Sequence, residues 1–203
     1  MRALLLTVPG LLFVAGCGSP APPEIPPPAP FDATAMVEAA FTEYDRNKNG
    51  FIEGSELDVF PALKGVLGGV DANRDGKVSK DELRARFESY SAANTGLISV
   101  PVSVTLDGVP LADATVQFVP EACMGGTIQE ATGKSQANGT VPKFVIDGKE
   151  QPGLQPGLYR VKVTRSDAGG KNLPVRYNVQ TTLGAEVFGG RGSQPLLFAL
   201  SSR

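Results

Sequence analysis

Two segments in the first half of the chain carry apolar residues at the spacing of an amphipathic helix. The apolar positions lie three or four residues apart in each segment: Val37, Ala40, Phe41 and Tyr44, then Leu83, Phe87 and Tyr90. This period places them on one helical face. Asp32 or Thr34 can cap the first helix, and Ser79 with Glu82 has capping-box spacing at the start of the second. The pattern therefore predicts two helices with a polar region between them.

From about residue 97 the pattern changes to alternating apolar and polar residues, which is typical of strands with one buried face. The alternating apolar positions fall in successive runs: Ile98, Val100, Val102, Val104 and Leu106; Ala114, Val116 and Phe118; Tyr159, Val161 and Val163; and Leu196, Phe198 and Leu200. A further short segment, residues 143–146, follows the second of the turn signals below. Asp107-Gly108 and Asn138-Gly139 are turn signals between them. We expect an α+β chain of two domains, a helical module over residues 31–94 and an antiparallel β-sandwich over residues 97–203.

Two polar loops of the helical module share one residue pattern. Loop 1 is DRNKNGFIEGSE, residues 45–56, and loop 2 is DANRDGKVSKDE, residues 71–82. Each has Asp at position 1, Asn or Asp at positions 3 and 5, Gly at position 6 and Glu at position 12. Gly50 and Gly76 stand where the chain needs a positive φ. Ile52 and Val78, at position 8, are β-branched residues that suit a short strand pair between the loops.

Short oxygen-bearing side chains at this spacing suit calcium, which takes about six to eight oxygen ligands. The loops fit the EF-hand calcium pattern, and residues 31–90 resemble that family. The resemblance implies two Ca2+ sites, with a backbone carbonyl as ligand at position 7, a water-bridged contact at position 9 and a bidentate Glu at position 12. The implied ligands are Asp45, Asn47, Asn49, Phe51, Glu53 and Glu56 in loop 1, and Asp71, Asn73, Asp75, Lys77, Ser79 and Glu82 in loop 2. The alternative is a pair of polar turns that bind no metal.

The connection between the loops departs from the family. It covers only residues 57–70 and contains Pro61, Gly65, Gly68 and Gly69. Pro61 disfavours helix at the residue before it and can begin a new helix, which the glycines weaken. We expect short helical pieces here, and whether the two loops pair closely stays open.

The N-terminus predicts export. A short apolar run over residues 3–15 contains Pro9 and follows Met1-Arg2, so it suits a signal peptide, residues 1–16, better than a membrane span. Val14-Ala15-Gly16-Cys17 is similar to the bacterial lipobox, which implies lipidation of Cys17. Gly18, and not Asp, follows the cysteine, and the resemblance then favours the outer membrane. Residues 17–30 would form a Pro-rich tether. An ordinary signal peptide with a chance cysteine is the alternative.

The second domain also resembles a known family. VTLDGVPLADATVQFVP, residues 104–120, and GLQPGLYRVKV, residues 153–163, are similar to carboxypeptidase-regulatory-like or transthyretin-like sandwiches, and residues 177–200 resemble their closing strands. Residues 125–141 depart from the family, because the usual short turn is longer and polar here. The shared motifs are turns and packing residues, so they predict a fold and no chemistry.

Composition excludes several kinds of chemistry. The chain has no His and no Trp, so it lacks the imidazole of a Ser-His-Asp or Cys-His site and of His-based zinc or haem ligation. Lipidation of Cys17 would leave Cys123 without a disulfide partner. The net charge is only −2 and no segment is strongly basic, which argues against a nucleic-acid partner. We expect a protein that is not an enzyme.

These features predict a calcium-binding lipoprotein of the outer membrane that faces the periplasm. Calcium would stabilise the helical module, and the sandwich would act as an interaction or scaffold domain that unfolds separately. In one alternative the sandwich binds a polysaccharide or another ligand and calcium is only a structural staple. In another, the loops only buffer calcium. Tyr159, Phe118 and Phe198 occupy core-like positions, which favours the interaction domain over a sugar-binding surface.

Overall fold

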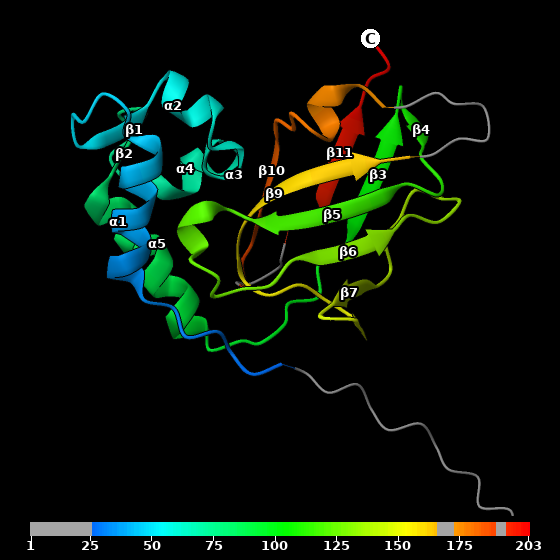
Figure 1. Cartoon of the computed structure of the whole chain (residues 1–203), viewed down its shortest axis with the longest axis horizontal. Helices are drawn as coiled ribbons and strands as arrows, with labels where there is room; N and C mark the ends of the chain where they lie inside the picture. Colours follow the sequence, from blue (N-terminus) through cyan, green and yellow to red (C-terminus); the bar gives the residue numbers. More distant parts are fainter. Residues whose placement is uncertain (1–25, 166–172, 190–193) are drawn as a thin grey trace, which may run out of the picture.

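The computed structural model describes residues 26–165, 173–189 and 194–203. The predicted signal peptide, Cys17 and most of the tether lie outside these residues. The fold is α+β: a helical module lies beside a largely antiparallel β-sandwich (Figure 1). In the part of the chain that is described, no helix has the length and apolar character needed to cross a membrane.

The helical module contains two longer helices, three short ones and a two-stranded ladder. The elements are α1 (Ala33–Tyr44), β1 (Phe51–Glu53), α2 (Ser55–Asp58), α3 (Pro61–Gly65), α4 (Leu67–Val70), β2 (Lys77–Ser79) and α5 (Lys80–Ala93). Both predicted apolar stripes are buried, on α1 and on α5. Asp32 caps α1 by accepting the N–H of Ala35 at 3.0 Å. Ser79 and Glu82 form the predicted capping box of α5.

The two loops pair closely, which answers the question left open by the short connection. β1 and β2 are antiparallel, and Ile52 lies opposite Val78 with both side chains fully buried. The connection folds into α2, α3 and α4, and α3 begins at Pro61 as predicted. Three short helices take the place of a long helix leaving loop 1 and a long helix entering loop 2. The loops are therefore brought together by the ladder and by the packing of α1 on α5.

The sandwich consists of two sheets. Its strands are β3 (Val102–Leu106), β4 (Val109–Pro110), β5 (Thr115–Pro120), β6 (Ala131–Lys134), β7 (Phe144–Ile146), β8 (Lys149–Gln151), β9 (Gly157–Thr164), β10 (Leu183–Val187) and β11 (Leu196–Leu200), with one-turn helices η1 (Ala122–Met124) and η2 (Val175–Tyr177). The larger sheet has the order β10-β9-β5-β6-β7-β8, and the smaller has β11-β3-β4. The pairing of β11 with β3 is parallel, whereas the other strand pairs are antiparallel.

Residues 125–141, which we expect to be a long polar turn, contain strand β6. This segment is short and weakly apolar, but β5 and β7 supply backbone partners on its two sides. Gly133 is needed there, because a Cβ atom would lie 2.3 Å from Cγ1 of Val141. The first strand also begins later than its alternation predicts, at Val102, and Ile98 makes only an isolated bridge to Leu154.

Buried apolar side chains form one cluster that contains residues of both modules. In the sandwich, the ring of Phe118 lies 5.7 Å from Phe144, 5.9 Å from Tyr159 and 6.1 Å from Phe198, measured between centroids. The core-like positions of these aromatics are therefore confirmed. The continuity of the core through the helical module was not expected from the sequence.

Candidate metal centre

Loop 1 is closed by hydrogen bonds from its backbone to its side-chain oxygens. Asp45 Oδ1 accepts the N–H of Asn49 at 3.1 Å, and its Oδ2 accepts the N–H of Gly50 at 3.0 Å. Asn47 Oδ1 accepts the N–H of Asn49, and Asn49 Oδ1 accepts the N–H of Phe51, both at 2.9 Å. Each of these oxygens retains a second acceptor site that a cation can use.

Loop 2 repeats this arrangement at the equivalent positions. Asp71 accepts the N–H groups of Asp75 at 3.2 Å and Gly76 at 2.8 Å. Asn73 Oδ1 accepts the N–H of Asp75 at 3.0 Å, and Asp75 Oδ1 accepts the N–H of Lys77 at 2.9 Å. Two segments of different sequence therefore adopt the same closed loop, which indicates that the pattern of Asp, Asn and Gly determines the geometry.

The position-12 carboxylates link the end of each loop to its beginning. Glu56 Oε1 accepts the N–H of Arg46 at 2.9 Å, and its Oε2 accepts the N–H of Glu53 at 3.1 Å. Glu82 accepts the N–H of Ala72 at 3.0 Å and that of Ser79 at 2.9 Å. Glu56 is 5% exposed, so its carboxylate is held in place inside the module.

The pKa of Glu82 lies below its usual value. Desolvation alone would raise it, but hydrogen bonds from Ser79, Ala72 and Asn73 together outweigh that effect. These bonds stabilise the charged form of the carboxyl group. Glu82 is therefore ionised at neutral pH, which is the state that a bidentate calcium ligand requires.

The position-9 residues are engaged in other contacts. Glu53 Oε2 pairs with Lys77 Nζ at 2.8 Å across the β1–β2 ladder, and its Oε1 accepts the side-chain N–H of Asn49 at 2.7 Å. Hydrogen bonds from Lys77 and then Asn49 hold the pKa of Glu53 below its ordinary range. Ser79 Oγ donates to Glu82 at 2.7 Å. Contacts from Glu53 or Ser79 to a metal, through water as predicted, would compete with these bonds.

Positive backbone φ angles occur at two equivalent positions of both loops, and loop 1 has a third at Gly54, with φ 52°. Gly50 has φ 85° and Gly76 has φ 81°, as the residue pattern predicts for position 6. Lys48 and Arg74, at position 4, also have positive φ, 57° and 62°, and our sequence analysis missed this. Only Gly, Asn and Asp reveal such positions in a sequence, and Lys and Arg carry no such signal.

The donor set of the loops fits a hard divalent cation. In the described residues, no group of three or more His, Cys, Asp or Glu side chains could by itself hold a metal ion. Each loop instead combines carboxylates with Asn side-chain oxygens and a position-7 carbonyl, an all-oxygen set of the kind that Ca2+ or Mg2+ prefers. The structure brings the predicted residues of each loop onto one closed turn, and the two turns lie side by side through the ladder.

Comparison with known families agrees with this geometry. The EF-hand family model matches residues 37–60 and 69–87. No curated protein matches the chain. The matched segments contain both loops, the C-terminal part of α1 and the N-terminal part of α5, so the match supports calcium as the partner of the helical module. It does not extend into the sandwich.

Proposed function

We propose that this protein is a calcium-binding lipoprotein of the outer membrane, facing the periplasm, in which each loop holds one Ca2+ ion. The observation that carries the calcium assignment is the identical hydrogen-bonded closure of two loops that both match the EF-hand model. Asp45, Asn47, Asn49, the Phe51 carbonyl and Glu56 would hold one ion. Asp71, Asn73, Asp75, the Lys77 carbonyl and Glu82 would hold the other.

Calcium in this proposal stabilises the module and does not open it. Sensor EF-hands expose a Met-rich groove when their helices separate. Here Met36 is buried, and α2, α3 and α4 are too short to act as a lever. The sandwich serves as an interaction or scaffold domain, and we assign no catalytic role to the chain.

Calcium titration by calorimetry tests the assignment. We expect two sites with dissociation constants of roughly 10⁻⁵–10⁻³ M, because Arg46, Lys48 and Arg74 add positive charge beside the ligands. Binding of zero or one ion by the folded, metal-free protein would contradict the two-site proposal.

We also propose that the sandwich is transthyretin-like. The Asp107-Gly108 turn between β3 and β4 has φ 50° and 80°, as a tight hairpin turn requires. Pro156-Gly157 precedes Tyr159 at the start of β9, and Tyr159 is fully buried. Both features support the family resemblance of residues 104–120 and 153–163, which concerns fold and leaves the partner unspecified.

The lipid anchor predicts membrane attachment through Cys17. Replacing Cys17 by Ser should leave the chain unprocessed or release it from the membrane fraction, because acyl chains supply roughly 0.8 kcal/mol of binding free energy per buried CH₂ group. Fractionation of cells that express the wild type and the variant, with Cys123→Ser as the matched cysteine control, measures this. A wild-type protein that is wholly soluble after export would contradict the anchor.

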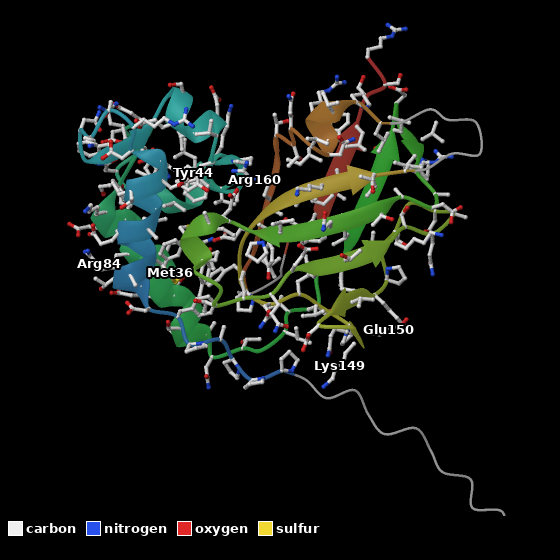
Figure 2. The ribbon with its side chains drawn as sticks, viewed as in Figure 1. Met36, Tyr44, Arg84, Lys149, Glu150 and Arg160 are labelled. Atoms are coloured by element: carbon white, nitrogen blue, oxygen red, sulfur yellow. The ribbon has the colours of Figure 1, made fainter. Side chains whose placement is uncertain are left out.

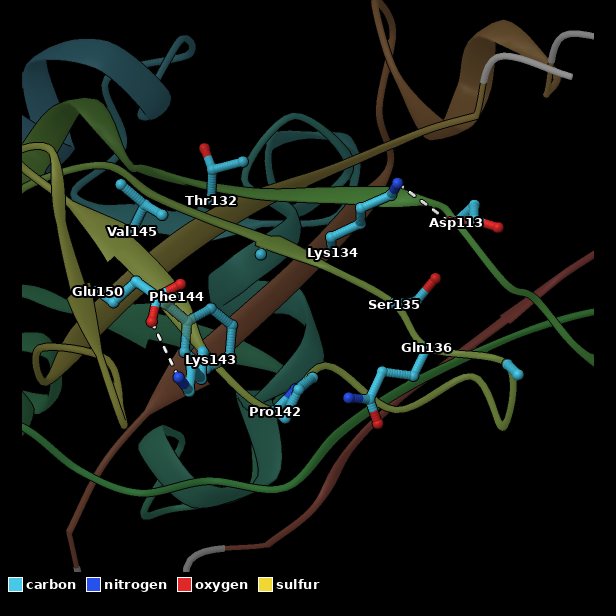
Figure 3. Close-up of a pocket in the computed structure, with 12 residues that line it drawn as sticks. Asp113, Thr132, Lys134, Ser135, Gln136, Pro142, Lys143, Phe144, Val145 and Glu150 are labelled. Atoms are coloured by element: carbon cyan, nitrogen blue, oxygen red, sulfur yellow. Dashed lines mark hydrogen bonds and ion pairs between the residues drawn. The ribbon is translucent and has the colours of Figure 1, made fainter.

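A groove on the sandwich keeps ligand binding as a second candidate function. It has a volume of about 500 Å³ and lies beside β6 and β7, between two exposed ion pairs, Lys134 with Asp113 and Lys143 with Glu150 (Figure 3). Neighbouring charges of both signs and the side chains of Thr132 and Gln136 suit a polar ligand such as a polysaccharide.

Affinity electrophoresis in gels containing a neutral glucan or a polyuronate tests the groove. If it binds sugar, the wild type should be retarded, and Lys134→Ala should restore free mobility because it removes one wall of the groove. Lys64→Ala is the control, since Lys64 also forms an exposed ion pair but lies in the helical module. Equal mobility in all gels would remove this candidate for the sugars tested.

A further inference from the structure

Three segments of the helical module are packed against the sandwich. α1 lies on η1, and α3 lies on β10 and β9 (Figure 1). α5 reaches β10 through Arg86 and Tyr90. The sandwich thus contacts the two long helices that flank the loops and also the connection between the loops. These contacts leave the helical module little freedom to move by itself.

The seam is the interface of α1, α3 and α5 with η1, β9 and β10. Its first polar contact is centred on Glu121, which follows β5. Its Oε2 accepts the hydroxyl of Tyr44 at 3.1 Å and a guanidinium N–H of Arg160 at 3.2 Å. Figure 2 shows Tyr44 on the helical module and Arg160 on the facing side of the sandwich. Arg160 also donates to the carbonyl of Val59 at 2.8 Å. Burial raises the pKa of Glu121 although Arg160 and Tyr44 oppose this, because Glu121 is only 3% exposed. Tyr44 directly precedes Asp45, the first ligand of loop 1.

The second polar contact joins α5 to β10. Arg86 Nε donates to Glu186 Oε1 at 2.6 Å, its Nη2 donates to Oε2, and Tyr90 donates its hydroxyl to Oε1. Burial raises the pKa of Tyr90 well above its usual value, so the hydroxyl keeps its proton. Glu82, Arg86 and Tyr90 are spaced four residues apart and therefore lie on one face of α5. The last ligand of loop 2 and the contact with the sandwich share a single helical stripe.

Between these two contacts the backbones of α3 and β10 touch. A Cβ atom at Gly184 would lie 2.2 Å from the N atom of Ala62 and 2.2 Å from the C atom of Pro61. Gly184 and Glu186 are two residues apart on β10, so both face the helices. Glycine is required here because a side chain would have no space. Its backbone conformation is not the reason, because Gly184 does not have a positive φ.

We infer that calcium binding at the loops is energetically coupled to the attachment of the helical module to the sandwich. Calcium then makes residues on the sandwich side of the seam open to solvent less often, although these residues supply no ligand. This inference rests on the proposed calcium sites. The sandwich is then the permanent partner of the EF-hand module, and it covers the helices that a sensor would turn toward a target. The coupling is an alternative to our expectation that the two domains unfold separately.

The coupling follows from mass action. A ligand that binds only the folded module suppresses every opening that unfolds the module, by a factor of about 100 per site at a hundredfold excess over the dissociation constant. If the seam opens only together with the module, residues on its sandwich side gain the same protection. If the seam opens independently, they gain none.

Cys123 can report on this opening. It lies in η1 on the sandwich side of the seam, packed toward α1, and it is fully buried. In the full-length chain with Cys17→Ser it is the only cysteine, so its reaction with a thiol reagent follows opening of the seam. We expect calcium, at about a hundredfold excess over the dissociation constant, to slow this reaction by about 100-fold for each site that the opening disrupts.

Gly184→Ala should uncouple the two modules. The added methyl group forces α3 away from β10, so the calcium-dependent slowing of Cys123 should fall to less than about tenfold, while calorimetry still detects calcium. Gly68→Ala is the matched control, because a Cβ atom at Gly68 meets no atom within 4 Å. It should retain the full effect of calcium.

Amide hydrogen exchange of β5 and β9 in the wild type provides a second measurement that needs no substitution. Calcium-dependent slowing of both Cys123 labelling and exchange in these strands supports the coupling. Calcium binding by calorimetry without slowing of either would overturn the coupling and leave the calcium sites intact. Absence of calcium binding would overturn the proposed function itself, so the two failures are distinguishable.

Discussion

Replacing Glu82 by Gln is expected to abolish calcium binding at loop 2 while loop 1 still binds one ion. Glu82 is the only position-12 carboxylate of loop 2, and the substitution removes its charge and one of its two anionic oxygens. Gln preserves the capping box of α5, because it also fits the third helical position. The loss should be at least about 100-fold in the affinity of loop 2, equivalent to about 2.7 kcal/mol of binding free energy.

Asp81→Asn is the matched control for this prediction. Asp81 is adjacent to Glu82, carries the same charge and is an exposed partner of Arg84, and it occupies no ligand position. Calorimetry should find two sites in the control and one in Glu82→Gln, with the helical content of both variants unchanged by circular dichroism. Two unchanged sites in Glu82→Gln would show that the loop 2 assignment is wrong.

Replacing Arg86 by Met should destabilise the whole protein by about 3–5 kcal/mol, because it leaves the carboxylate of Glu186 buried without its cation. The side chain of Glu186 is 6% exposed, and Tyr90 would be its remaining partner from α5. Met preserves apolar contact with the ring of Phe188, which lies 4.4 Å from the guanidinium carbon of Arg86. Urea unfolding at a fixed, saturating calcium concentration measures the change in the free energy of unfolding.

Two further variants make this result specific. Arg84→Met changes the same residue type on the same helix, but its partner Asp81 is exposed, so the cost should be within about 1 kcal/mol. The double variant Arg86→Met with Glu186→Met should regain much of the lost stability, since no buried charge remains. Equal effects of Arg84→Met and Arg86→Met would show that the ion pair at the seam contributes no more to the free energy of unfolding than the exposed pair does.

The candidate metal centre could be predicted from the sequence because its determinants are local. The ligand positions of each loop lie within twelve residues, and the glycine at position 6 identifies the turn. The caps of α1 and α5 and the turn before β4 depend on equally short ranges, whereas the pairing of Ile52 with Val78 joins two loops and was settled only by the structure. Strand β6 escaped prediction because backbone pairing with β5 and β7 holds it, whereas its own four residues show no clear strand pattern.

The attachment of the two modules could only be found in the tertiary structure. Glu186 alternates with the buried Ala185 and Val187, so its position in the sequence predicts an exposed carboxylate. It is buried because α5 covers that face of β10, and contact between segments about a hundred residues apart leaves no periodic signal. The calcium loops are thus a property of short-range residue patterns, whereas the joining of helices and sandwich into one body depends on complementary surfaces that form only when both have folded.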